Sequence, residues 1–189
     1  MPSSSMFRRM CAAAGLLALV VVTGCGSGAS SSDAAPDGWR TLETPSVSVA
    51  YPEGFEEQGA DERSKYNAAA AELNEDGRTV ALITVQRGFT EANSAEQAAI
   101  AAEAGIQLGA KVDGTEEVEL AGTDDARRID FTFEATGEGD GPAKGAVVEG
   151  LILTGLDSSE ETFAVRVDAQ KGKLSGADLE RIVASVEVR

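Results

Sequence analysis

Apolar and polar residues alternate with a period of two through the second half of the chain, and this pattern predicts β-strands. One strand ends at Leu120 before a turn at residues 122–125, and a second surrounds residues 129–133. A more continuously apolar third strand covers residues 146–154, and an alternating fourth covers residues 163–168. Because short turns join these strands, we expect an antiparallel meander.

Two further strands are expected in the first half of the chain. Residues 46–51 place Val47, Val49 and Tyr51 on one face, as in a strand with one buried side. Residues 78–87 carry apolar side chains on both faces, which is typical of a strand in the centre of a sheet.

Residues 66–73 are ambiguous between a strand and a helix. Their four consecutive alanines favour a helix by intrinsic propensity. Against this, Asn74-Glu75-Asp76-Gly77 has the composition of a tight turn and leads directly into the strand at 78–87. We expect a β-hairpin here, with a helix as the alternative.

Two helices have clear start signals. Ser94 and Gln97 form a capping box before a helix expected over residues 95–108, with Gly109 as its stop and alanines on its buried face. A C-terminal helix begins at Ser175, and its apolar residues fall at helical spacing on one stripe: Leu179, Ile182, Val183 and Val186. The order of elements predicts one α+β domain, an antiparallel sheet of about six strands packed by two or three helices.

The N-terminal region has the organisation of a secretory signal peptide. Two arginines, Arg8 and Arg9, precede an apolar run at residues 12–22, which is shorter than the roughly 20 residues that span a bilayer. Val22-Thr23-Gly24-Cys25 follows and resembles the lipobox of bacterial lipoproteins. The resemblance implies that residues 1–24 are removed and that Cys25 carries lipid, with plain secretion as the alternative.

This assignment divides the chain and accounts for its cysteines. Residues 25–38 hold the lipidated Cys25 and a Gly-, Ser- and Asp-containing stretch expected to be a flexible tether, and residues 39–189 form the domain. Cys11 leaves with the signal peptide and Cys25 is acylated, so no disulfide is expected. The expected location is the extracytoplasmic face of the cell membrane, with the lipid bilayer as a partner through Cys25.

Charge excludes one class of partner. All 32 acidic residues follow Cys25, whereas two of the 16 basic residues precede it, which leaves a net charge of −18 after Cys25. Nucleic acid requires a basic surface, so we expect no nucleic-acid partner. Solubility explains the acidic residues, and attraction of a basic partner is the alternative.

The domain also resembles a known family. Trp39, the Tyr51-Pro52-Glu53-Gly54-Phe55 turn, the mid-chain helix, the meander and the closing Leu179–Ser185 helix resemble the PsbP-like fold and, more narrowly, the LpqN-type lipoproteins of actinobacteria. The resemblance implies an antiparallel sheet packed by helices and a binding or accessory role. It provides no catalytic motif.

Candidate chemistry is sparse. The chain contains no histidine, which excludes Ser-His-Asp hydrolysis and histidine zinc sites. The Gly137–Gly141 run lacks the helix and lysine of a phosphate loop and is expected to be a mobile hairpin tip, and Asp76, Asp124 and Asp125 lack calcium-loop spacing. We expect no enzyme, cofactor or metal, although composition alone does not exclude a carboxylate-based hydrolase.

Two functions follow from this reasoning. The first is a membrane-anchored, non-catalytic binding or accessory module for a protein partner in the envelope. The alternative is a carrier or sensor of a small apolar ligand or lipid, held in a groove between the alanine-lined helix and the sheet. Tight packing of the alanines explains the same residues without a groove.

Overall fold

A computed structural model describes residues 37–189. The predicted signal peptide, Cys25 and nearly all of the tether lie outside the described residues. Within residues 37–189 the strands are β1 Arg40–Glu43, β2 Val47–Tyr51, β3 Glu56–Glu57, β4 Ala69–Glu75, β5 Arg78–Arg87, β6 Lys111–Leu120, β7 Thr123–Glu134, β8 Val147–Leu156, β9 Thr162–Gln170 and β10 Glu187–Val188. The helices are α1 Ala95–Ala104 and α2 Gly176–Ala184.

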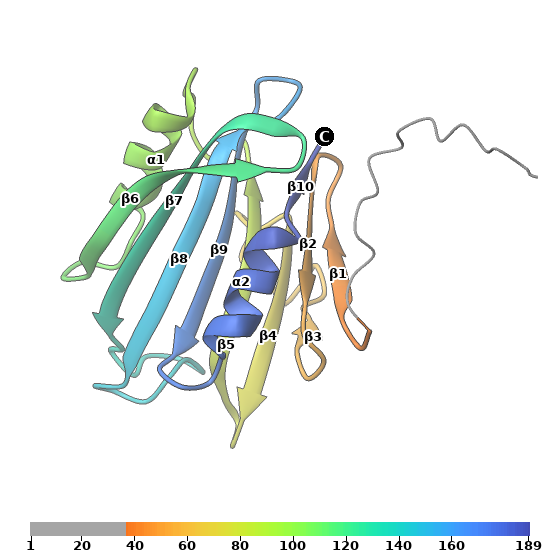
Figure 1. Ribbon diagram of the computed structural model, residues 1–189. Helices are drawn as coiled ribbons and strands as arrows, with labels where there is room; N and C mark the ends of the chain where they lie inside the picture. Colours follow the sequence, from red (N-terminus) through yellow and green to blue (C-terminus); the bar gives the residue numbers. More distant parts are fainter. Residues whose placement is uncertain (1–36) are drawn as a thin grey trace, which may run out of the picture. The chain divides into compact units, whose positions relative to one another are not determined.

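A seven-stranded antiparallel sheet forms the centre of the fold, with strand order β3-β4-β5-β9-β8-β7-β6 (Figure 1). The predicted α+β class and the predicted meander β6-β7-β8-β9 are confirmed, with seven strands in place of about six. Strand β5 lies between β4 and β9, as its apolar faces indicated. Edge strand β6 is longer than expected, because its exposed polar residues carry no alternating apolar signal.

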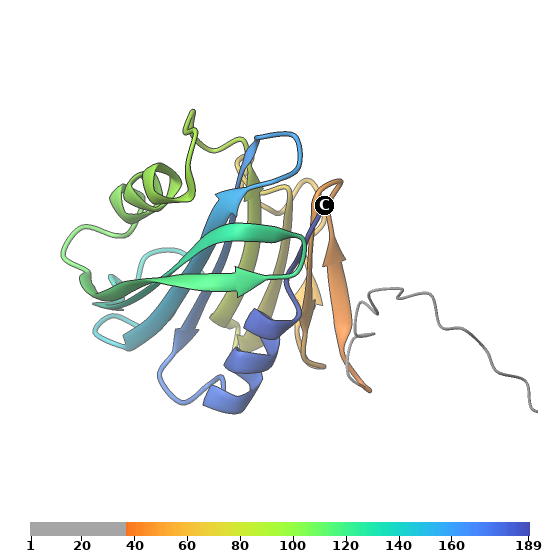
Figure 2. The ribbon, with the colours of Figure 1, turned by 45° about the horizontal axis from the view of Figure 1, so that its top comes forward.

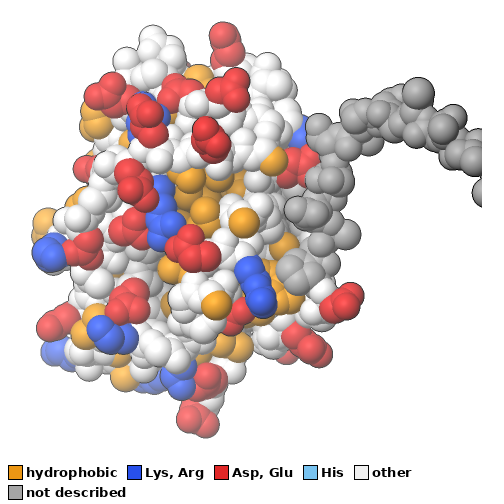
Figure 3. Space-filling view, in the orientation of Figure 1, with side chains coloured by type: hydrophobic (Ala, Val, Ile, Leu, Met, Phe, Trp, Pro, Cys, Tyr) orange, Lys and Arg blue, Asp and Glu red, His pale blue; other side chains and the backbone are white. Residues whose placement is uncertain are grey.

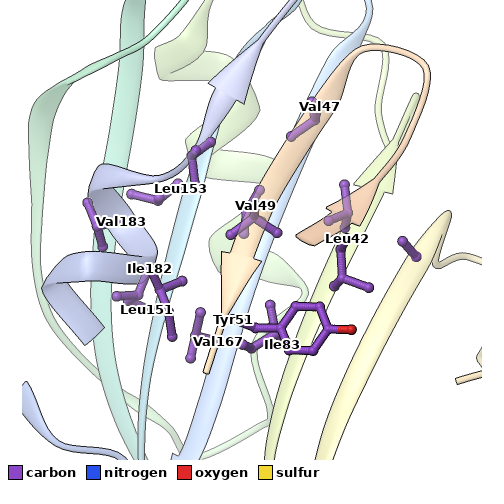
Figure 4. Close-up of a cluster of buried hydrophobic side chains, with 14 of the residues drawn as sticks. Leu42, Val47, Val49, Tyr51, Ile83, Leu151, Leu153, Val167, Ile182 and Val183 are labelled. Carbon is purple, nitrogen blue, oxygen red and sulfur yellow. The ribbon is translucent and has the colours of Figure 1, made fainter. Parts of the chain in front are cut away.

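A second sheet of three strands, β1-β2-β10, was not expected from the sequence. It joins both ends of the described chain, since β10 pairs with β2. This sheet and α2 pack on one face of the seven-stranded sheet, where Val49 and Tyr51 meet Leu151, Leu153 and side chains of α2 (Figure 4). The expectation of a single sheet was wrong because the pairing of β10 joins segments almost 140 residues apart.

Helix α1 lies on the opposite face of the main sheet from α2 (Figures 1 and 2). Its cap is as predicted: the Ser94 side chain accepts a hydrogen bond from the Gln97 backbone N–H at 3.3 Å. The helix ends at Gly105, so the expected extension to Leu108 and the stop at Gly109 were wrong. Glycine has a low helix propensity, so ending the helix at Gly105 costs less free energy than continuing it through that residue.

The ambiguity at residues 66–73 is resolved as a hairpin. β4 pairs with β5 through a turn in which Asp76 and Gly77 have φ values of 51° and 75°. Positive φ at both central residues is the mark of a type I′ turn, whose twist matches that of the flanking strands. Ala69, Ala70 and Ala71 are buried, so tertiary burial outweighs their helix propensity.

The tip of the β6–β7 hairpin reaches the C-terminal strand. The Val188 backbone N–H donates to the Ala121 carbonyl at 2.7 Å. A Cβ on Gly122, which has a φ of 88°, would lie 1.7 Å from the Val188 carbonyl oxygen, so only glycine fits there. None of the helices in residues 37–189 has the length and apolar character to cross a membrane.

Candidate ligand-binding cavity

The two faces of the main sheet are covered unequally. Helix α1 packs on one end of its face, where its alanines contact Ile129, Phe131 and Ile152. No helix of residues 37–189 lies over the part of this face formed by β4, β5, β9 and the start of β8, although it carries half-buried apolar side chains such as Leu82.

A cavity of about 330 Å³ occupies this uncovered part of the sheet. Its apolar lining residues include Val80, Leu82, Val148 and Phe133. The side chains and backbone that line it come from five strands and two connections: Gln58, Glu72, Thr79, Val80, Ala81, Leu82, Phe133, Asp140, Gly141, Pro142, Val148, Asp168 and Gln170. Ligand cavities typically combine an apolar floor with a few polar groups in this way.

The connection between β7 and β8 forms one wall of the cavity. Its Asp140 carbonyl accepts from the Thr79 backbone N–H at 2.7 Å, and its Gly141 carbonyl accepts from Arg78 Nη1 at 2.9 Å. The glycine-rich segment was expected to be a mobile tip, yet it crosses β8 and β9 and is attached to β5. Strand β8 follows it, so it lacks the helix of a phosphate loop.

Asp168 on β9 lies at the inner side of the cavity, paired with Arg166. Arg166 Nε donates to both carboxylate oxygens of Asp168 at 3.0 Å. The guanidinium also stacks over the Phe131 ring, 5.0 Å from its centroid. Burial raises the pKa of the Asp168 carboxyl, and the neighbouring Arg166 charge opposes that rise.

Gly150 on β8 makes room for this pair. A Cβ at Gly150 would lie 2.4 Å from the Phe131 ring and 2.9 Å from Asp168 Oδ1. The missing side chain therefore lets the ring and the carboxylate flank β8 on the cavity face. Glycine in a strand interior commonly marks such a close approach.

Glu72 on β4 holds the opposite side of the cavity. Asn74 Nδ2 donates to Glu72 Oε1 at 2.8 Å, and the Gln58 amide donates to Oε2, whereas the Thr79 hydroxyl donates to Asn74 Oδ1 at 3.0 Å. The two amides hold the carboxylate in one orientation. No Lys or Arg lies within salt-bridge distance of Glu72 in the part of the chain that the structure describes.

The α2 face carries a smaller hollow of about 240 Å³ between α2 and strands β7 and β8. Its acidic groups are already occupied: Asp113 pairs with Lys111 and accepts from Thr132 at 2.9 Å, and Asp130 pairs with Arg128. The Lys111 hydrogen bond, with that from Thr132, lowers the pKa of Asp113. Acidic side chains are spread widely over this face, around a central apolar area (Figure 3).

The groove predicted beside the alanine-lined helix is not where the cavity lies. The alanines on the inner side of α1 are buried and pack tightly, as the simpler explanation predicted: Ala95, Ala98, Ala99 and Ala102. None of these alanines lines the cavity. Across residues 37–189, Asp76, Asp124 and Asp125 do not join any group of three acidic side chains suited to a metal ion. Cys25 lies outside the described residues.

Sequence reasoning missed the cavity residues because each looks ordinary on its own strand. Arg166, Asp168 and Gln170 alternate with Val165 and Val167, a pattern that is typical of a strand with one solvent face. The available signal was Leu82, an apolar residue on the side of β5 that also carries Thr84. Only the register of five strands shows that these residues surround one space.

Comparison with known proteins leaves the family open. No protein-family model matches the chain, and a search of curated proteins finds no match. A protein of known structure from Bacteroides thetaiotaomicron is similar at 14% identity and a TM-score of 0.47, over 80% of this chain, which spans 49% of that protein's length. A protein of unknown function from Pseudomonas aeruginosa is similar at 10% identity and a TM-score of 0.39, over 75% of this chain and 86% of its own. These similarities carry no functional conclusion.

Proposed function

We propose that this protein is a membrane-anchored, extracytoplasmic binding protein that holds a small molecule in the cavity on the α1 face. The observation that carries the proposal is the uncovered apolar floor formed by Val80, Leu82 and Val148, enclosed by a connection that is hydrogen-bonded to β5. The lipobox at Val22–Cys25 supports the anchor. We propose holding rather than catalysis, since the sequence contains no histidine and no recognised catalytic motif.

The resemblance to LpqN-type lipoproteins with a PsbP-like fold is part of this proposal. It is supported by the Tyr51–Phe55 turn and by the closing helix α2, both of which contribute to the core. That resemblance implies a binding role, and we propose the cavity as the binding site.

Occupancy of the cavity can be tested directly. The described residues 37–189 belong to one compact unit, so a chain of residues 26–189 retains all the described structure. Native mass spectrometry of this chain, isolated from its own host, is expected to show a bound small molecule. Leu82→Trp fills the cavity and should abolish the adduct, whereas Ile100→Trp on the exposed side of α1 should keep it. Equal adducts in both variants would place the ligand elsewhere.

A protein partner remains a second candidate, supported by the β6 edge. Residues 111–117 of this strand are exposed and its outer side is unpaired in the main sheet, which leaves backbone groups free for another strand. A photo-crosslinker at Glu116 is expected to capture an envelope protein if this edge is used. One at Asp61, an exposed acid between β3 and β4 at the opposite edge of the sheet, serves as the matched control.

A further inference from the structure

The cavity has a one-sided charge. Its lining includes three acidic residues, Glu72, Asp140 and Asp168, and no lysine or arginine. The whole domain is strongly acidic as well, so the surroundings add to the negative potential instead of cancelling it. An anionic ligand entering this space would meet only like charge.

The nearest guanidinium does not change this sign. Arg166 donates from Nε to Asp168 and stacks its guanidinium over the Phe131 ring. It also donates from Nη1 to the Gly105 carbonyl at 3.5 Å. It therefore neutralises one carboxylate and is held away from the cavity by α1. Arg78, at the other wall, donates a hydrogen bond from Nη1 to the Gly141 carbonyl.

Glu72 is the acid best prepared to receive a donor. It is half-buried, it has no ion-pair partner within residues 37–189, and the Gln58 and Asn74 amides fix its orientation beside the apolar floor. Each carboxylate oxygen can accept more than one hydrogen bond, so it keeps capacity for a ligand N–H. Hydrogen bonds between a charged donor and a carboxylate are about twice as strong as neutral ones.

We propose that the cavity binds a small organic cation, an ammonium group attached to an apolar body. The ammonium donates to Glu72, with Asp140 adding to the attraction, and the apolar body lies on Val80, Leu82, Val148 and Phe133. The volume of about 330 Å³ lies near the lower end of the range for ligand cavities, about 300–1,000 Å³, so the body is small. This inference rests on the proposed binding function and specifies its ligand class.

Three probes of equal length and different charge test it: n-octylamine, n-octanol and n-octanoate, titrated calorimetrically into residues 26–189 at neutral pH. Octylammonium is expected to bind about tenfold more tightly than octanol, and octanoate more weakly than both. Glu72→Gln should remove most of the preference for the ammonium and leave octanol affinity within about twofold. Glu96→Gln, an equal charge change on the exposed side of α1, should leave both affinities unchanged.

The possible failures are distinguishable. Octanol or octanoate binding as tightly as octylammonium, with loss of binding in Leu82→Trp, would overturn the cation assignment and leave the binding cavity standing. An ammonium preference that Glu96→Gln weakens as much as Glu72→Gln would also overturn it, because the preference would then come from net charge alone. Failure of all three probes to bind, while the native adduct is still observed and is lost in Leu82→Trp, would overturn the ligand class and leave the binding function standing. Absence of any adduct on the protein isolated from its own host would overturn the binding function itself.

Discussion

The two faces of the central sheet differ in what covers them. On one face, α2 and the β1-β2-β10 sheet bury a continuous core that includes Leu153 and Phe163. On the other face, α1 covers one end with alanines and leaves Leu82 half-buried beside a cavity. The same strands therefore supply stability through one face and a binding surface through the other.

The largest difference is expected from a matched pair of leucines. Leu153→Ala on the covered face should lower the free energy of unfolding by about 3–4 kcal/mol, because it leaves a void in a fully buried site. Leu82→Ala on the open face should cost about 1 kcal/mol or less, since the side chain is already in contact with solvent. Urea denaturation of both variants measures this, and equal losses would mean that the two faces are equally important for stability.

A smaller effect is expected where the open face is tightly packed. Gly150→Ala places a Cβ 2.4 Å from the Phe131 ring and should cost about 1–3 kcal/mol through overpacking. It should also displace the Arg166–Asp168 pair and reduce ligand binding. Gly114→Ala on edge strand β6, where the new Cβ meets no atom within 4 Å, is the control. Thermal unfolding measures the stability of each variant, and probe titration measures its ligand affinity. Together they would show whether Gly150→Ala weakens binding without a comparable loss of stability.

The smallest effect concerns two acids whose pKa values shift in opposite directions. The pKa of Asp157 is lowered because hydrogen bonds from Ser46, Arg87 and the backbone at Ser159 and Glu161 outweigh its burial, whereas the pKa of Asp168 is raised chiefly by burial. Asp157 therefore stabilises the fold above its unfolded pKa of about 4, and this contribution is lost as the pH falls through its folded pKa. Asp168 acts in the reverse sense, since the folded state favours its protonated form.

Asp157→Asn should accordingly cost about 1 kcal/mol near neutral pH, because an amide oxygen accepts the same donors without the charge. The gap between the variant and the wild-type protein should close as the pH falls below about 4. Urea midpoints measured from pH 7 to pH 3 provide the check. A gap that stays constant over this range would mean that the Asp157 charge does not contribute.

Sequence patterns predicted the elements that are regular over several residues. The apolar alternation around Phe131, the capping side chains Ser94 and Ser175, and the Asp76-Gly77 turn each act locally, so their signals survive without knowledge of the fold. Strands β1 and β10 have four and two residues, and their pairing depends on distant partners. Short segments of this kind carry too little periodicity to be recognised.

The cavity could not be predicted for a related reason. Four of the cavity residues come from four strands that are not all consecutive in the sheet: Glu72, Leu82, Asp168 and Phe133. The wall at Gly141 comes from a connection that crosses β8 and β9. Each side chain has an ordinary local pattern. The binding surface exists only through strand order and register, which no single stretch of sequence encodes.

The position of β1 has a mechanical consequence. β1 is the outer strand of the small sheet, and within the described chain its strand pairing is to β2 alone, through the four residue pairs from Arg40↔Tyr51 to Glu43↔Ser48. Tension applied through the preceding residues would act first on this pair of strands. β4, β5, β8 and β9, which form most of the cavity, lie in the other sheet and outside that load path. If the chain is anchored through its N-terminal residues, as proposed, such tension would reach β1 and β2 before the strands of the candidate cavity.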